Sequence, residues 1–159
     1  MNDISHPIHA GPPHAATVVA RTQESPGIFT LQLRLDDAAA QAAYRFAPGQ
    51  FNMLYLYGVG EVPISIMSDP EEREVIGHTI RAQGRVTQGL AALQPGDTLG
   101  LRGPFGRGWP LQEMGGRDVV LVTGGLGCAP VVSVIHYVLR RRERSGKLVI
   151  IQGVKHAED

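Results

Sequence analysis

The segment TGGLGCAP, residues 123–130, has the composition of a loop that binds phosphate groups with its main chain. Glycine adopts positive φ without strain, and its missing Cβ lets a pyrophosphate contact the backbone directly. A helix that begins just beyond such a loop turns its free N–H groups and the positive end of its dipole toward the phosphates. The spacing Gly125-x-Gly127-x-x-Pro130 therefore predicts a dinucleotide site, while a merely tight strand-to-helix turn is the alternative. The predicted binding residues are Thr123, Gly124, Gly125, Leu126, Gly127, Cys128, Ala129 and Pro130.

Side chains near this loop bear on the choice of nucleotide and on reactivity. An acidic residue after the second strand normally binds the ribose of NAD. Here the segment GVKHAED presents Lys155 first, which could meet a 2′-phosphate, and Glu158 and Asp159 follow it, so NAD and NADP both stay open. We interpret Cys128 as a small side chain that fits beside the phosphates, because the sequence assigns no basic partner to its thiol.

The remaining residues that could do chemistry form no recognisable cluster. A single cysteine excludes an internal disulfide and any metal or iron–sulfur site built from several thiolates of this chain. His9 and His14 lie in an arm rich in Pro, His and Gly over residues 1–15, which we expect to be flexible and solvated. Tyr44, Tyr55, Tyr57 and the six histidines are interpreted as packing or surface residues, so we predict no catalytic side chain and no metal ligand.

The composition argues against several classes of partner. The 159 residues carry 15 Lys and Arg and 15 Asp and Glu, and this zero net charge predicts neither nucleic acid nor an anionic membrane as a partner. No apolar run approaches the roughly 20 residues that span a bilayer. Residues 1–15 lack the basic and apolar regions of a signal peptide, so we expect a cytoplasmic location. The basic cluster at 140–142 and 144 is expected to offset a helix dipole.

Two kinds of element must position these residues. Short segments with the character of β-strands follow one another, with turn residues between them: ATVVARTQ at 16–23, IFTLQLRL at 28–35, FNMLYLY at 51–57, EVPISIMS at 61–68, EVIGHTIRAQ at 74–83 and DTLGLRG at 97–103. They predict a six-stranded antiparallel barrel over residues 16–106. A polar insert occupies 36–44, and Thr87 is expected to cap a helical turn that runs to Leu93.

The pattern changes beyond a boundary near 106–117. DVVLVTG at 118–124 is a continuous apolar run, as expected of a strand buried on both faces of a parallel sheet. A helix of about fifteen residues is expected within 129–146, with Gly146 near its end. KLVIIQGV at 147–154 predicts a second strand. Residues 117–159 therefore predict one strand–helix–strand unit of a Rossmann-like nucleotide-binding domain.

Three stretches together resemble the ferredoxin–NADP reductase superfamily: residues 46–66, 78–106 and 122–130. Within it they look most like the gamma subunit of cytoplasmic nickel–iron (sulf)hydrogenases, with the electron-transfer subunits of anaerobic sulfite reductase and dihydroorotate dehydrogenase close behind. The resemblance implies a Greek-key flavin barrel followed by an NAD(P) domain. The residues that it implies for FAD are Val62, Pro63, Ile64, Ser65, Thr79, Ile80, Arg81, Gly84, Val86 and Thr87.

The resemblance also implies roles for some of these residues. Ser65 would offer a hydroxyl to the flavin ring, and Arg81 would offer a fixed charge to phosphate. Many relatives have an arginine and a tyrosine where this chain has Val62 and Ile64. The loss of that arginine should weaken cofactor binding unless Arg81 or Arg85 compensates, while Ile64 can still cover the ring by dispersion.

Further departures concern the end of the chain. The hydrogenase-type relatives carry a cysteine cluster for a two-iron centre, and its cysteines are absent from this sequence. We therefore expect a C-terminally incomplete version of a longer subunit, in which the apolar residues of 147–154 are exposed or covered by a partner.

The function that the resemblance implies is electron transfer. Hydride would pass between NAD(P)H and FAD, and single electrons would pass to the iron–sulfur and catalytic subunits of a hetero-oligomeric redox complex, such as a nickel–iron hydrogenase. A dihydroorotate dehydrogenase or sulfite reductase complex is the alternative of the same class. A truncated module that only binds a partner, and a barrel whose glycine loop is purely structural, are alternatives of another class.

Overall fold

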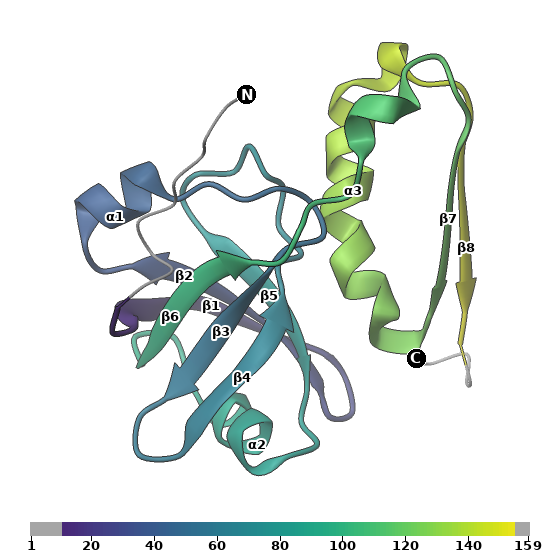
Figure 1. Ribbon diagram of the computed structural model, residues 1–159. Coiled ribbons are helices and arrows are strands. Elements are labelled where there is room, and N and C mark those ends of the chain that lie inside the picture. The colour runs from purple at the N-terminus through teal and green to yellow at the C-terminus, as the bar shows by residue number, and fades with distance from the viewer. Residues whose placement is uncertain (1–10, 155–159) are drawn as a thin grey trace.

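In the computed structural model, which describes residues 11–154, the larger part of the chain is a six-stranded antiparallel sheet that curls into a barrel (Figure 1). Its strands are β1 (His14–Ser25), β2 (Ile28–Leu35), β3 (Phe51–Leu56), β4 (Gly60–Ser65), β5 (Ile76–Arg81) and β6 (Thr98–Phe105). They lie in the order β4-β3-β6-β1-β2-β5. The six predicted strands are confirmed, although β1 begins within the predicted arm, at His14, and residues 1–10 of that arm lie outside the described residues.

The core of the barrel follows from the alternation along its strands. Phe29, Leu31, Leu33 and Leu35 of β2 are at most 2% exposed. They pack with apolar residues from the other strands in one hydrophobic cluster. Since successive side chains of a strand point to opposite faces, this alternation places the intervening residues on the outside.

Two short helices lie in the connections between strands, and the bounds of both differ from those that the sequence predicts. The polar insert forms α1 (Ala38–Ala43), where the Asp37 carboxylate accepts the N–H of Ala40 at 2.9 Å. Helix α2 (Arg85–Ala91) begins before Thr87 and ends before Leu93. Thr87 therefore lies inside the first turn, where its Oγ1 accepts the N–H groups of Gly84 at 2.9 Å and Gln83 at 3.0 Å.

The second part of the chain is the predicted strand–helix–strand unit. It consists of β7 (Val119–Gly124), the short turn η2 (Gly125–Cys128), α3 (Ala129–Arg140), the turn η3 (Arg142–Arg144) and β8 (Leu148–Gly153). The connection from the barrel to this unit contains the short turn η1 (Leu111–Met114). β7 and β8 are parallel and pair from Val119–Leu148 to Gly124–Gly153. Helix α3 is shorter than expected, because the chain turns after Arg140. Beyond this turn, the N–H of Gly146 donates to Arg117 O at 2.7 Å.

The expectation that the strand at 118–124 is buried on both faces is wrong. α3 covers one face of the β7–β8 pair, and no element within residues 11–154 covers the other (Figure 1). Val120 is 56% exposed and Val122 is 70% exposed, and both stand next to exposed partners, Val149 and Ile151, on β8. The apolar composition of β7 therefore marks an open face rather than a second covered one.

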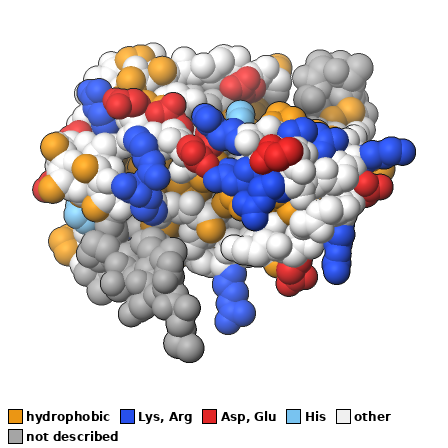
Figure 2. Space-filling model, turned by 90° about the horizontal axis from the view of Figure 1, so that it is seen from above, with side chains coloured by type: hydrophobic (Ala, Val, Ile, Leu, Met, Phe, Trp, Pro, Cys, Tyr) orange, Lys and Arg blue, Asp and Glu red, His pale blue; other side chains and the backbone are white. Residues whose placement is uncertain are grey.

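Helix α3 lies between the barrel and the β7–β8 pair (Figure 1). At its carboxyl end, Arg140 donates to the Asp69 carboxylate and Arg141 to the Glu71 carboxylate, both in the connection between β4 and β5. Figure 2, which views the molecule of Figure 1 from above, shows basic and acidic side chains next to one another near the middle of that view. The basic cluster expected only to offset the helix dipole thus also forms ion pairs between the two parts of the molecule.

None of the helices found between residues 11 and 154 is long and apolar enough to cross a membrane.

Candidate nucleotide-binding site

Three cavities, of about 420, 540 and 180 Å³, lie where the barrel meets the glycine loop, and a fourth, of about 310 Å³, lies over the start of α2. Arg81, the last residue of β5, lines all four of them. Among the described residues, Arg81 has no ion pair and its side chain makes no hydrogen bond. A guanidinium that is shared by four cavities and has no acidic partner within residues 11–154 favours a ligand with several negative charges.

The 180 Å³ cavity joins the two strands predicted for the flavin ring to the glycine loop. It is lined by Pro63, Ile64, Ser65, Thr79, Ile80, Arg81, Leu126, Ala129 and Pro130. Ile64 also packs against the hydrophobic core, while Ser65 is half-buried. The Thr79 hydroxyl is paired with the Thr30 hydroxyl at 2.8 Å, so Ser65 is the hydroxyl in this cavity without a bond to another described side chain.

The 310 Å³ cavity lies over the turn that begins α2. Its lining includes Val62, Gly84, Val86 and Thr87, all predicted for the flavin, together with Glu61, Gln83 and Arg85. Arg85 donates to Val59 O at 3.0 Å, which leaves its guanidinium at the rim of the cavity. Glu61 is paired with Arg102 at 2.7 Å, so the Glu61 carboxylate is balanced and the net charge of the cavity comes from Arg81 and Arg85.

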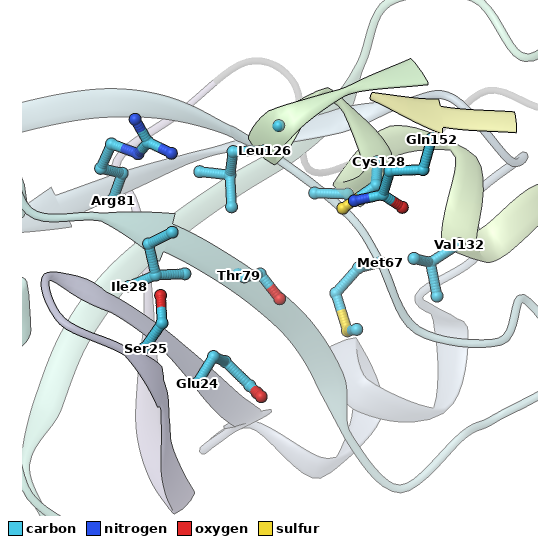
Figure 3. A pocket seen from close by; sticks show the side chains of 12 residues that line it. Glu24, Ser25, Ile28, Met67, Thr79, Arg81, Leu126, Cys128, Val132 and Gln152 are labelled. Atoms are coloured by element: carbon cyan, nitrogen blue, oxygen red, sulfur yellow. The ribbon is translucent and has the colours of Figure 1, made fainter. Parts of the chain in front are cut away.

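The two larger cavities border the glycine loop. Gly124, Gly125 and Leu126 line the 540 Å³ cavity with Gln83 and Gly153. The 420 Å³ cavity lies between the loop and the β1–β2 hairpin, and Figure 3 shows Cys128 and Gln152 on the side opposite Glu24 and Ser25. Of the predicted loop residues, Thr123 and Gly127 line none of the four cavities, and Thr123 Oγ1 is buried without a hydrogen-bond partner.

The main chain of the glycine loop faces open space. Gly125 has φ of +50°, a conformation that favours glycine, and a Cβ built on Gly124, Gly125 or Gly127 would meet no atom within 4 Å. The helix begins at Ala129, as the sequence predicts, and the short turn η2 precedes it, with the Ala129 N–H donating to Leu126 O. The free N–H groups of this site therefore belong to the loop residues before Ala129 rather than to the first turn of α3.

A buried hydrogen-bond network supports the flavin strands from inside the barrel. His78 Nδ1 donates to Ser65 O at 2.9 Å, the Asn52 amide donates to His78 Nε2 at 3.2 Å, and the Tyr44 hydroxyl donates to Asn52 Oδ1 at 2.9 Å. Burial lowers the pKa of His78 to about 4 and raises the pKa of Tyr44. Tyr44, Asn52 and His78 are all buried, and this network fixes the end of β4 against β5.

The sequence analysis missed several residues that line the cavities. Glu24, Ser25, Met67 and Gln152 belong to no motif, and Gln83 lies in the stretch 78–106 but is not among the residues predicted to bind. Their positions depend on how the two parts of the molecule pack, which no local pattern reveals. His9, Lys155, Glu158 and Asp159 lie outside the described residues. Within residues 11–154, no three His, Cys, Asp or Glu side chains are grouped as metal ligands would be.

Known proteins resemble this chain in sequence. The gamma subunit of sulfhydrogenase 1 from Pyrococcus furiosus is 41% identical over 126 residues, which are 79% of this chain and 43% of that subunit. A probable dihydroorotate dehydrogenase B (NAD(+)) electron transfer subunit from Methanocella arvoryzae is 36% identical over 119 residues, which are 75% of this chain and 41% of that subunit. The chain thus spans less than half the length of these relatives.

A solved structure shares the fold. A ferredoxin NADP+ reductase from Neisseria gonorrhoeae, with bound FAD and NADP, superposes with a TM-score of 0.76 at 23% identity over 94% of this chain and 60% of that chain. The expected fold, a six-stranded barrel followed by a strand–helix–strand unit as in that reductase, is confirmed. Residues 15–109 match the oxidoreductase FAD-binding domain, and this chain belongs to that family of FAD-dependent oxidoreductases.

Proposed function

We propose that this chain binds FAD between the barrel and the glycine loop and transfers electrons between NAD(P)H and an iron–sulfur partner. The observation that carries the proposal is the position of Arg81, which lines a cavity over the α2 turn, a cavity over the glycine loop and the cavity between them. A cation that no described residue pairs, beside two stretches of open main chain, suits two nucleotides whose phosphates approach each other.

The residues around the barrel side fit FAD. Pro63, Ile64 and Ser65 line a narrow cavity of about 180 Å³ with apolar walls and one available hydroxyl, as a flavin ring requires. Arg81 and Arg85 supply positive charge at the α2 turn, where a Cβ on Gly84 would meet only Thr87 Oγ1, at 4.0 Å. Arg81 and Arg85 would thus replace the arginine that relatives have in place of Val62.

The residues around the loop fit a nicotinamide nucleotide. Gly124 and Gly153 end the two parallel strands and Gly125 follows Gly124 directly, and ligands of open α/β sheets bind beyond the carboxyl ends of such strands. The open space over Gly124 and Gly125 admits a pyrophosphate against the main chain. The choice between NAD and NADP stays open in this proposal.

FAD, when bound, accepts a hydride and releases electrons one at a time, so the hard chemistry belongs to the cofactor. The side chains need only bind, orient and exclude water, and none acts as acid, base or nucleophile. The final electron carrier would be an iron–sulfur subunit of a sulfhydrogenase-type complex in the cytoplasm. Similarity to a dihydroorotate dehydrogenase electron transfer subunit supports a second candidate of the same class.

The absorbance of the purified protein tests the proposal. Bound oxidised flavin gives visible absorbance, and anaerobic NADH or NADPH should bleach it. A colourless protein that binds no added FAD would favour a barrel with a purely structural glycine loop. Flavin that neither nucleotide reduces would favour a module that binds flavin and a partner without oxidising NAD(P)H. Electron transfer to purified hydrogenase or dihydroorotate dehydrogenase subunits distinguishes the two complexes.

A further inference from the structure

The connection between β4 and β5 contacts both parts of the molecule. We call residues 66–71 the connecting segment. It is attached to the barrel by three hydrogen bonds: Ile66 N to Gln50 O at 3.0 Å, Met67 N to Gly77 O at 2.9 Å, and Gly77 N to Ser68 Oγ at 3.0 Å. Because the segment follows Ser65 directly, its position is coupled to the strand that lines the 180 Å³ cavity.

The same segment runs along α3. Met67 lines the 420 Å³ cavity together with Cys128 and Val132 near the start of the helix (Figure 3). Further along, the Asp69 carboxylate accepts from Arg140 and the Glu71 carboxylate accepts from Arg141, at the end of the helix. The segment therefore shares a cavity with the start of the helix and forms ion pairs with its end.

Neighbouring groups hold a carboxylate of one ion pair and a guanidinium of the other in place. The side chain of Asp69 is 14% exposed, and its Oδ1 accepts the N–H of Glu71 at 3.0 Å. The Arg141 guanidinium lies over the Tyr137 ring, 4.1 Å from its centroid. Both carboxylates come from the barrel and both cations from α3, so the two pairs act together across the junction.

We propose that Asp69, Glu71, Arg140 and Arg141 are positioning residues, which set the distance between the glycine loop and the strands β4 and β5. Helix α3 starts directly after the loop, so a displacement of α3 against the connecting segment also displaces Leu126 and Ala129, which line the same cavity as Ser65. The purpose of this positioning, hydride transfer to flavin, rests on the proposed function. The positioning of the loop does not depend on the proposed function.

Cys128 provides a readout that is independent of any cofactor. It is the only cysteine of the chain, and it is partly buried in the cavity between the loop and the barrel. Its rate of reaction with a maleimide on the full chain, at matched flavin content, measures how often the junction opens. We expect Arg140→Glu/Arg141→Glu to raise this rate about 10-fold at low salt, since two exposed pairs together contribute about that factor.

Three comparisons make the test specific. Arg144→Glu is the matched control, because Arg144 is an exposed cation just beyond the same helix and forms no ion pair with a described residue. The exchanged pair Glu71→Arg/Arg141→Glu should return the rate to within about twofold of the parent, whereas Arg141→Glu alone should not. Salt at 1 M, where the Debye length is about 3 Å, should accelerate labelling of the parent but not of the double reversal.

The result that overturns the proposal is a double reversal that reacts within twofold of Arg144→Glu. Unchanged thermal unfolding must accompany the faster reaction, because a protein that unfolds would also expose Cys128, and that outcome counts against positioning. If flavin is bound, the double reversal should slow its reduction by saturating NAD(P)H without changing FAD affinity. Faster labelling in a protein that binds no flavin would support the positioning and refute the proposed function.

Discussion

Polar residues of one strand of this barrel lie in opposite environments, some in the core and some at the cavities. His78 is fully buried next to Thr79, yet it faces away from the cavities and bonds Ser65 O and Asn52. Arg81, three residues later, is exposed and lines each of the four cavities described above. Strand alternation thus places a structural histidine and a candidate binding arginine on one strand with opposite environments.

The buried state of His78 predicts a specific pH dependence of stability. Its pKa is about 4 in the folded chain and about 6.5 when unfolded, so the unfolded state binds more protons between these values. The free energy of unfolding should therefore fall by up to about 3 kcal/mol as the pH drops from 6.5 to 4, and level off below. Urea unfolding at several pH values measures this change.

A comparison of variants assigns this dependence to His78. The lowered pKa values of Asp37 and Asp69 affect stability only as the pH falls below their ordinary value of 3.8, outside this range. His78→Gln should abolish most of the slope between pH 6.5 and 4, whereas His136→Gln, at an exposed histidine, should retain it. Equal slopes in the two variants would contradict the assignment.

Arg81 predicts an effect on flavin affinity. Arg81→Met removes a charge-assisted contact to phosphate, which contributes about 1.5–3 kcal/mol, so FAD should bind roughly 10- to 100-fold more weakly. Quenching of flavin fluorescence in a titration measures this. Arg34→Met is the matched control, since Arg34 is an exposed arginine on β2 that lines none of the four cavities. Equal affinities in the two variants would remove Arg81 from the site.

At the scale of elements, local patterns predicted what local interactions determine. The alternation in β2 predicted its limits and its buried residues, and the glycine spacing predicted the turn between β7 and α3. The Asn52–His78 contact and the Asp69–Arg140 pair join positions 26 and 71 residues apart, and no local pattern indicates them. The two-sided burial predicted for β7 failed because an apolar run does not reveal how many layers cover it.

The glycine loop offers a test in which stability and binding separate. Gly124 has an ordinary extended conformation, φ −135° and ψ 128°, and a Cβ there would meet nothing within 4 Å. Gly124→Val should therefore unfold within about 0.5 kcal/mol of the parent, as surface substitutions usually do. It should nevertheless weaken the binding of NAD(P)H at least about tenfold, because the side chain fills the space that a pyrophosphate would occupy.

Isothermal titration with NADH and NADPH, together with urea unfolding, measures both quantities. Gly115→Val is the matched control, since Gly115 lies in the connection between the two parts and also has open space around it. If both variants bind the nucleotides equally well, the loop is a structural turn.

At the scale of the whole molecule, the two parts differ in how much core supports them. The main hydrophobic cluster is drawn entirely from the barrel, between Ala16 and Leu101. The β7–α3–β8 unit buries residues such as Val131, Val134 and Val138, yet one face of its sheet is open. A unit with less buried apolar area unfolds at lower free energy, so local opening should begin there.

This difference predicts two-step unfolding that the chain itself can report. Its only tryptophan, Trp109, packs on Gly49 at the barrel, and the main-chain N–H of Trp109 donates to Pro48 O at 2.9 Å. Its only cysteine, Cys128, lies in the second unit. In a urea titration, Cys128 should become fully reactive at a lower concentration than the one at which Trp109 fluorescence changes. Coincident midpoints for both probes would instead show that the barrel and the strand–helix–strand unit unfold as one cooperative body.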